Sequence, residues 1–107
     1  MKYFYSVLIF LFFTQAIVAQ NEGTIRGIVL DKTSGESMIG ANIAVVGTDQ
    51  GTVTDIDGNF DLNLVSGTYS LQISYLGFQE LIQEGVVVTA NKVTLLPDIF
   101  LSEDAQQ

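Results

Sequence analysis

The chain has 107 residues, a formal net charge of −8 at pH 7, and neither cysteine nor histidine. Its length allows one small domain, and its acidity makes nucleic acid and anionic lipid surfaces poor partners. The lack of cysteine excludes disulfides and a lipid-modified cysteine anchor. Because histidine is missing as well, the usual general base, zinc ligands and thiol nucleophile are absent, and we expect a protein that is not an enzyme and needs no cofactor.

The first 19 residues have the pattern of a helical secretory signal peptide. Lys2 precedes an apolar run over residues 3–13, which is shorter than the ~20 residues that a membrane-spanning helix needs. The small side chain of Ala19 suits the position before a cleavage site, so we predict cleavage between Ala19 and Gln20 and export of the remaining chain. The alternative is an uncleaved membrane anchor, which requires the apolar run to continue through the polar residues that follow it.

Beyond the leader, runs of β-branched and apolar residues alternate with glycine-bearing turns, which predicts short β-strands. In chain order we expect strands over residues 23–30, 41–46, 52–54, 60–64, 69–75, 86–89 and 93–96, with a return segment over 78–82. No segment has the sustained spacing of three and four that an amphipathic helix shows. The pattern predicts an all-β fold of about seven strands, a single two-sheet antiparallel β-sandwich over residues 20–101, followed by a tail or the start of a linker over residues 102–107.

Local signals predict the turns and the core. Asp57 and Gly58 form a strong hairpin signal, because both central positions of the favoured tight turn need positive φ. Gly27 predicts a bulge or a close contact inside the first strand, and Pro97 limits the last segment to a sheet edge or a strand start. The strand alternation predicts a core made of Ile25, Val29, Ile43, Val45, Phe60, Leu62, Leu64, Tyr69, Leu71, Ile73 and Val93.

Two groups of residues suggest binding chemistry, and each has a structural alternative. Tyr75 and Phe78 are able to form an aromatic platform for a sugar or a peptide, but the alternation places Tyr75 among the buried residues of its strand. Asp55, Asp57 and Asp61 are candidate calcium ligands. Their spacing lacks the glycine and the bidentate glutamate of the helix-flanked calcium loop, so we interpret them as solvated acids around a hairpin turn and expect no metal site.

The ordered glycines and the T-D-x-D-G-x-F block resemble the carboxypeptidase regulatory-like domain family over nearly the whole chain beyond the leader. The residues that carry the resemblance are Gly27, Val29, Asp31, Ser34, Gly35, Glu36, Gly40, Ala41, Asn42, Ile43, Gly47, Thr48, Gly51, Thr52, Thr54, Asp55, Asp57, Gly58, Phe60, Ser74, Tyr75, Gly77 and Phe78. The resemblance implies a transthyretin-like (prealbumin-like) sandwich. It also argues against enzyme activity, because in carboxypeptidases this module accompanies the catalytic domain and carries none of its zinc ligands.

Such a domain after a signal peptide resembles the N-terminal extension of SusC/RagA-type TonB-dependent outer-membrane receptors of Bacteroidetes. The resemblance implies a location in the periplasm, associated with the outer membrane, and as partners the other domains of a receptor or envelope proteins. Residues 96–107 resemble the linker that leads into the TonB box, so the chain is interpreted as a truncated receptor, a fragment or a stand-alone secreted domain. Residues 85–90, GVVVTA, are interpreted as a strand of the domain; the alternative is a TonB box that pairs with an energising partner by strand addition.

The leading hypothesis is a non-catalytic periplasmic accessory domain of, or derived from, a TonB-dependent receptor for nutrient uptake. Its contacts with other proteins are expected at exposed edge strands, because unpaired backbone groups there accept a partner's strand. The alternatives are a stand-alone secreted module that binds carbohydrate or peptide through loops at one end of the sandwich, and a cell-surface spacer. No insertion of the mature domain into a membrane is expected.

Overall fold

The computed structural model describes residues 21–104. The predicted signal peptide with its cleavage site at Ala19 and Gln20, and the last residues of the predicted tail, lie outside the described residues. The described part forms eight strands: β1 (Glu22–Asp31), β2 (Asn42–Val45), β3 (Gly51–Val53), β4 (Asn59–Val65), β5 (Gly67–Ser74), β6 (Leu81–Val88), β7 (Val93–Leu95) and β8 (Ile99–Leu101). Within residues 21–104, no helix is long and apolar enough to cross a membrane.

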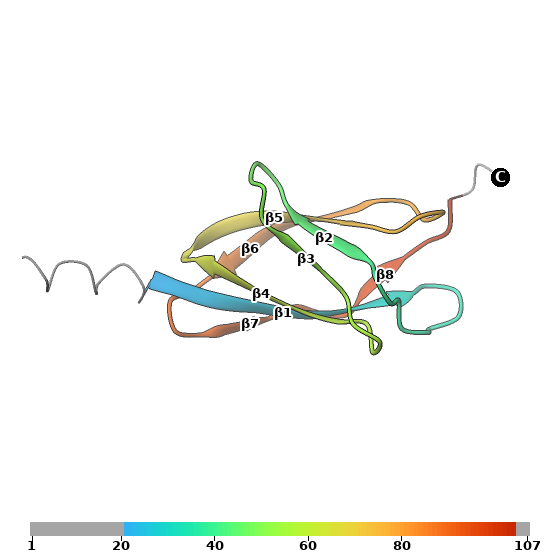
Figure 1. The fold of residues 1–107 in the computed structure, drawn as a ribbon, viewed down its shortest axis with the longest axis horizontal. Coiled ribbons are helices and arrows are strands. Elements are labelled where there is room, and N and C mark those ends of the chain that lie inside the picture. Colours follow the sequence, from blue (N-terminus) through green and yellow to red (C-terminus); the bar gives the residue numbers. More distant parts are fainter. Residues whose placement is uncertain (1–20, 105–107) are drawn as a thin grey trace, which may run out of the picture.

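The strands form two layers (Figure 1). One sheet has the order β4-β1-β7, with β8 also paired to β1, and the other has the order β3-β2-β5-β6. This confirms the predicted two-sheet β-sandwich. All strand pairs are antiparallel except β1–β7 and β1–β8, which are parallel; β1 pairs antiparallel with β4.

The core lies between the two layers, where strand alternation buries one side chain in two. In β4, Phe60, Leu62 and Leu64 are buried while the intervening residues are exposed. Most of the predicted core is confirmed, with Tyr69 partly buried against it. The prediction fails for Val93, which is 49% exposed because its register partner Thr24 lies on the outer face of β1. The core also includes residues that were not predicted: Met38, Ala41, Val86, Val88, Ile99 and Leu101.

A glycine bulge joins two predicted segments into one strand, β6. Residues 78–82 and 86–89 were expected as separate strands, but β6 runs from Leu81 to Val88 and pairs with β5 along its length. The register shifts between Tyr69 and Leu71, so that Ser70 stands opposite two residues of β6. Gly85 lies at the bulge and has φ of +68°. This left-handed conformation accommodates the extra residue, as in other bulges that contain a left-handed glycine.

The chain after β7 contributes an eighth strand. Leu101 is 1% exposed and Ile99 is 3% exposed, and β8 pairs with the end of β1. Residues 99–101 therefore belong to the sandwich rather than to a linker. Pro97 lies between β7 and β8, in the gap between two short strands along the same side of β1, where a residue without an N–H breaks no ladder bond.

The turn before β4 differs in detail from the predicted one. Gly58 has φ of +78°, whereas Asp57 does not have positive φ. The Gly58 N–H donates to the Asp55 carbonyl at 3.0 Å, which fits a type I turn followed by a left-handed glycine. Only the second residue of the Asp57–Gly58 pair therefore needs the left-handed conformation.

Candidate functional site

The acidic residues proposed as calcium ligands are used locally. The Asp55 carboxylate accepts hydrogen bonds from the backbone N–H groups of Asp57 and Asn59, both at 2.9 Å. Asp61 lies on the outer face of β4, where its carboxylate is 2.6 Å from Nε of Arg26. Within residues 21–104 there is no group of three or more metal-ligating side chains, so the structure does not bring these three aspartates together.

Tyr75 and Phe78 meet at one end of the sandwich. Their ring centroids are 5.6 Å apart and the rings are inclined at 73°, which is the edge-to-face arrangement that aromatic pairs favour. The predicted burial of Tyr75 is wrong, because β5 ends at Ser74 and Tyr75 is 38% exposed. Phe78 is half-buried and packs against the core. The pair is thus an apolar surface anchored in the interior.

Two open grooves meet at this aromatic pair. One, of ≈ 580 Å³, extends along Asn42, Ser74 and Glu80. The other, of ≈ 240 Å³, is lined by Glu36, Met38 and Ile39 of the β1–β2 loop. Sequence reasoning missed the two most exposed apolar residues that line these grooves: Leu76, 96% exposed, and Ile39, 55% exposed. The signal that could have found them is an apolar residue placed directly before a turn glycine, Gly77 or Gly40.

A buried threonine holds the β1–β2 loop in place beside these grooves. The Thr54 hydroxyl donates to the Met38 carbonyl at 2.5 Å and accepts from the Ala41 N–H at 2.8 Å. Thr54 is 3% exposed, so water does not compete for these bonds. The exposed side chain of Ile39 is therefore carried by a loop that is fixed on both sides.

Residues 102–104, which we call the exit segment, hold the β5–β6 loop. Gln79 N–H donates to the Ser102 carbonyl at 2.8 Å, and Asp104 N–H donates to the Gly77 carbonyl at 2.9 Å. The backbones of Phe78 and Glu103 also pair as an isolated antiparallel β-bridge. The loop that carries Tyr75 and Leu76 is thereby tied to the last described residues.

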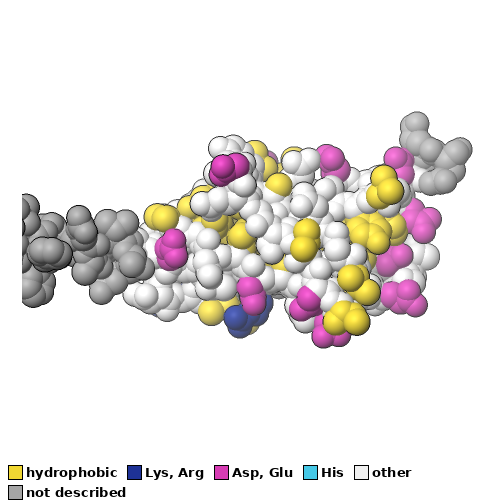
Figure 2. Space-filling model, in the orientation of Figure 1, with side chains coloured by type: hydrophobic (Ala, Val, Ile, Leu, Met, Phe, Trp, Pro, Cys, Tyr) yellow, Lys and Arg dark blue, Asp and Glu magenta, His cyan; other side chains and the backbone are white. Residues whose placement is uncertain are grey.

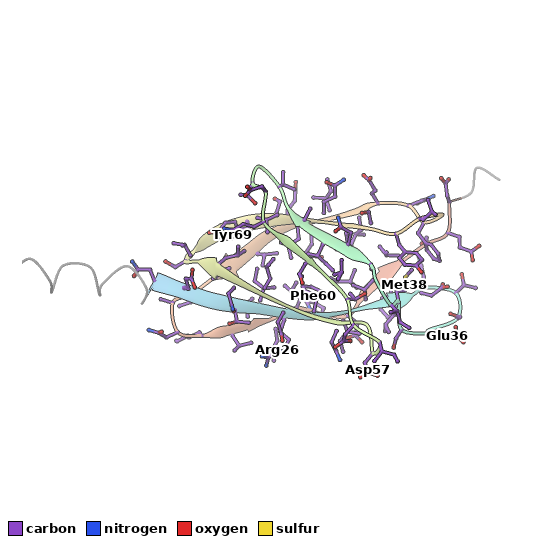
Figure 3. The ribbon with its side chains drawn as sticks, in the orientation of Figure 1. Arg26, Glu36, Met38, Asp57, Phe60 and Tyr69 are labelled. Atoms are coloured by element: carbon purple, nitrogen blue, oxygen red, sulfur yellow. The ribbon has the colours of Figure 1, made fainter. Side chains whose placement is uncertain are left out.

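Acidic side chains surround this end of the domain (Figures 2 and 3). Figure 2 shows hydrophobic and acidic side chains interspersed at this end, which is on the right of the view. Figure 3 places Glu36 and Asp57 on the loops of the same end. On the loops and strand ends at this end, and on the exit segment, the acidic residues are Asp31, Glu36, Asp55, Asp57, Glu80, Glu103 and Asp104. Among the described residues, Lys32 is the one basic residue on these segments, while Arg26 pairs with Asp61 on the sheet and Lys92 lies in the β6–β7 turn at the opposite end.

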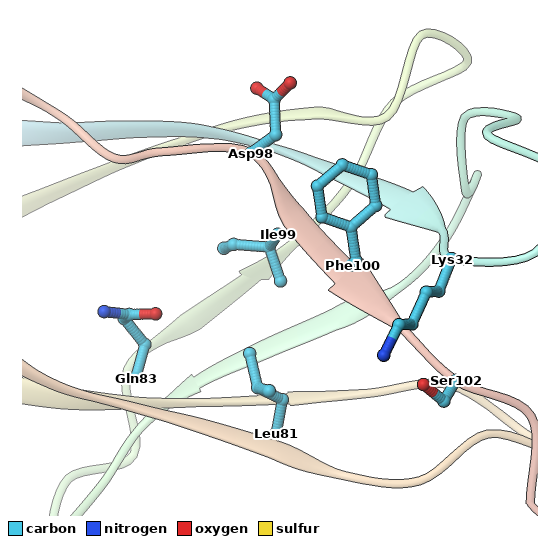
Figure 4. Close-up of a pocket in the computed structure, with 7 residues that line it drawn as sticks. All are labelled: Lys32, Leu81, Gln83, Asp98, Ile99, Phe100 and Ser102. Carbon is cyan, nitrogen blue, oxygen red and sulfur yellow. The ribbon is translucent and has the colours of Figure 1, made fainter.

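A further groove, of ≈ 620 Å³, lies between the edges of the two sheets (Figure 4). Leu81 on β6 and Ile99 on β8 lie on its opposite sides, and Lys32 and Ser102 lie at one end. It has one cation and one acid, Asp98, among its lining residues. Its polar groups do not converge on one point, so we do not assign it a ligand.

The sheet edges are mostly unsuited to long strand pairing. β3, β7 and β8 have three residues each, and β6 carries the bulge at Gly85. Short and bulged edges are the common protection against unwanted strand addition. The edge strand β4 has seven residues and alternates regularly, which makes it the edge best suited to accept a partner's strand.

The segment over residues 85–90 is not available as a TonB box in this structure. Val86 and Val88 are each 3% exposed and belong to the core. Val86 pairs with Tyr69, and Val88 pairs with Gly67. The alternative interpretation of this segment is therefore wrong, because pairing with another protein would require both valines to leave the core.

Comparison with known proteins agrees with the fold and the motifs. Residues 25–107 match the CarboxypepD_reg-like domain family. The chain is 42% identical over 81 residues to the TonB-dependent receptor SusC of Bacteroides thetaiotaomicron, an alignment that covers 76% of this chain and 8% of the receptor. A TonB-dependent receptor of Formosa agariphila is 38% identical over 72 residues, covering 67% of this chain and 7% of the receptor. The chain thus spans only about 7–8% of the length of these relatives.

Solved structures share the architecture. A chain in a crystal structure of a type II cohesin–X-dockerin complex from Acetivibrio cellulolyticus superposes with a TM-score of 0.63 at 26% identity, covering 74% of this chain and 56% of that one. A second mutant of the same complex gives a TM-score of 0.63 at 25% identity. Together with the family match over residues 25–107, which includes seven strands and most of β1, these similarities confirm the predicted resemblance. The chain belongs to the carboxypeptidase regulatory-like domain family.

Proposed function

We propose that this chain provides a non-catalytic accessory domain of, or derived from, a TonB-dependent outer-membrane receptor for nutrient uptake, and that it acts in the periplasm through contacts with other proteins. The observation that carries the proposal is the 42% identity over 81 residues to the receptor SusC. Domains this similar over 76% of the chain share a fold. The partners in this proposal are other domains of the receptor or proteins of the cell envelope.

The chemistry of the domain supports a role in contact rather than catalysis. Its interior is filled by apolar side chains, and the buried threonine hydroxyl holds a loop. The grooves on its surface are open and are lined by mixed side chains without a nucleophile paired to a base. Exposed apolar residues on rigid loops are the kind of feature through which proteins bind each other.

Co-purification from the native envelope tests the function. The full chain with a C-terminal affinity tag is expressed in its native organism. The tagged protein is purified from a detergent extract of the envelope, and the proteins that co-purify with it are identified by mass spectrometry. We expect specific recovery of TonB-dependent receptor or energising-complex components. Saturable binding of soluble oligosaccharides without recovery of any such component would instead support the stand-alone carbohydrate-binding module.

Export is tested separately, by the mass of the processed chain. The small Ala19 before Gln20 is the feature on which cleavage depends. We expect the intact mass of the purified protein to correspond to a chain that begins at Gln20. Ala19→Arg should retain the leader, and a wild-type protein recovered with its leader in the cytoplasmic fraction would contradict periplasmic action.

A further inference from the structure

We propose that the surface around Tyr75 and Phe78 docks a basic segment of a partner protein, one that carries lysine or arginine beside apolar anchor residues. The surface is defined by Ile39, Tyr75, Leu76 and Phe78, and we call it the end surface. This inference rests on the proposed function, because it takes the domain to act through protein contacts. It adds where the contact is made and what chemistry the partner brings.

The apolar part of the end surface has the features of a docking site. Leu76 is 96% exposed and Ile39 is 55% exposed, so both side chains meet water in the free domain. Two grooves run from the aromatic pair, one toward Glu80 and one toward Glu36. An aromatic pair anchored in the core and flanked by grooves offers recesses for apolar side chains, which commonly supply most of the binding free energy at an interface.

The surface is also rigid before any partner arrives. Phe78 N–H donates to the Tyr75 carbonyl at 3.0 Å, and the exit segment holds the same loop at Gly77 and Gln79. On the other side, the Thr54 hydroxyl fixes the β1–β2 loop at Met38 and Ala41. Because both loops are already ordered, little conformational entropy is lost when a partner binds.

The charge around the end surface selects the partner. Glu36 and Asp31 line one groove and Glu80 lines the other, and further acids follow on the β3–β4 turn and the exit segment. Lys32, the one basic residue of these segments among those described, lines the separate groove between β6 and β8. At protein interfaces, surfaces with electrostatic potentials of opposite sign face each other. An acidic segment or an anionic lipid surface would be repelled here, whereas a basic segment would be attracted and steered toward the apolar centre.

Another exposed apolar area, on the outer face of β7, lacks this charge pattern. Val93 and Leu95 lie on the outer face beside Thr24 and Arg26, where a basic residue and its ion pair with Asp61 leave no excess of negative charge. Leu95 is 73% exposed, so it provides a matched control. A partner chosen by hydrophobicity alone would use either leucine, but a basic partner should use only Leu76.

Peptide probes of defined charge test the proposal. The chain is purified in the processed form that its native cells produce. It is titrated with three peptides: the basic apolar peptide Lys-Leu-Lys-Val-Lys-Leu, the acidic apolar peptide Glu-Leu-Glu-Val-Glu-Leu and the basic polar peptide Lys-Ser-Lys-Ser-Lys-Ser. Backbone amide chemical shifts are followed by NMR. We expect only the first peptide to bind with saturable shifts in residues 36–42 and 74–80. Its affinity should fall about tenfold when NaCl rises from about 0.05 to 0.5 M, because salt screens exposed charges.

Two leucine variants locate the contact. Leu76→Ser should weaken binding of the basic peptide about tenfold, as expected for loss of an apolar anchor, whereas Leu95→Ser should leave it unchanged. Both leucines are exposed, and unchanged thermal unfolding verifies that each variant is folded. Equal binding of the acidic peptide, no binding of the basic one, or equal effects of the two variants would overturn the proposal.

The two proposals fail in different ways. If receptor components are recovered equally well by wild-type protein and by Leu76→Ser, the accessory role stands and the end surface is not the contact. If the wild-type protein recovers no envelope component although the basic peptide binds as expected, the accessory role fails and the end surface still binds basic segments.

Discussion

The ring of Phe60 packs directly against Gly27 on the neighbouring strand. The two residues are register partners in the β1–β4 pair, and a Cβ atom at position 27 would lie 2.7 Å from both Cε1 and Cζ of the ring. Phe60 is 3% exposed and lies between the two sheets (Figure 3). The sequence suggested a bulge or a close contact at Gly27, and the structure shows the contact: an aromatic side chain covers a glycine across the strand pair.

Gly27→Ala should therefore destabilise the domain by about 1–3 kcal/mol, the usual cost of overpacking a core. The added methyl group requires a movement of a buried ring that is packed on all sides. The measurement is the free energy of unfolding from urea denaturation.

Gly67→Ala is the matched control for this change. Gly67 lies in β5 without positive φ, and its nearest neighbours are atoms of Tyr69 at 3.6 Å, so a methyl group fits there. We expect little change or a gain of up to about 1 kcal/mol. Equal losses for the two alanine variants would show that strand propensity, not the Phe60 ring, determines the result.

Thr54→Val should cost about 2–4 kcal/mol, because it leaves the buried Met38 carbonyl and Ala41 N–H without their partner. Thr54→Ser keeps the hydroxyl and should lose much less. Urea denaturation gives the free energies, and amide exchange at Ala41 should accelerate in the valine variant alone. If valine were tolerated as well as serine, the hydroxyl would not be what holds the β1–β2 loop.

Long alternating strands were predictable because one buried face fixes their periodicity. In β4 and in most of β5, every second residue is apolar and enters the core. The bulge in β6 hides this signal. Leu81 and Gln83 face inward before Gly85, but Val86 and Val88 face inward after it, so the periodicity shifts by one residue and the strand resembles two short ones.

Short strands and strand ends were not predictable from local pattern. In β7, the order Val-Thr-Leu does not reveal which face is buried, and pairing with β1 decides it. At the end surface, the alternation of β5 seemed to continue through Tyr75, but the strand ends one residue earlier, at Ser74. The candidate docking site depends on such loops, whose positions are set by tertiary contacts, chiefly those of Thr54 and of the exit segment.

Gly85→Ala tests the bulge. The residue has φ of +68° with no atom within 4 Å of an added Cβ, so the cost is backbone strain alone, about 1–2 kcal/mol. Gly85→Asn should lose less, because asparagine tolerates the left-handed region better. Thermal and urea unfolding of both variants provide the comparison. Equal stability of the alanine variant and the wild type would mean that β6 can pair with β5 without this conformation.

The ion pair between Arg26 and Asp61 should contribute little to stability. Its 2.6 Å distance is short, but the side chains are 52% and 62% exposed, and solvent screens such pairs to a coupling of about 0.2–1 kcal/mol. A double-mutant cycle with Arg26→Gln and Asp61→Asn measures this coupling, which should shrink in about 1 M NaCl. Thr24 and Asn63 form an uncharged hydrogen bond of 2.7 Å across the same two strands, so their coupling should not depend on salt. A large, salt-independent Arg26–Asp61 coupling would show that geometry, rather than charge, links the strands at this position.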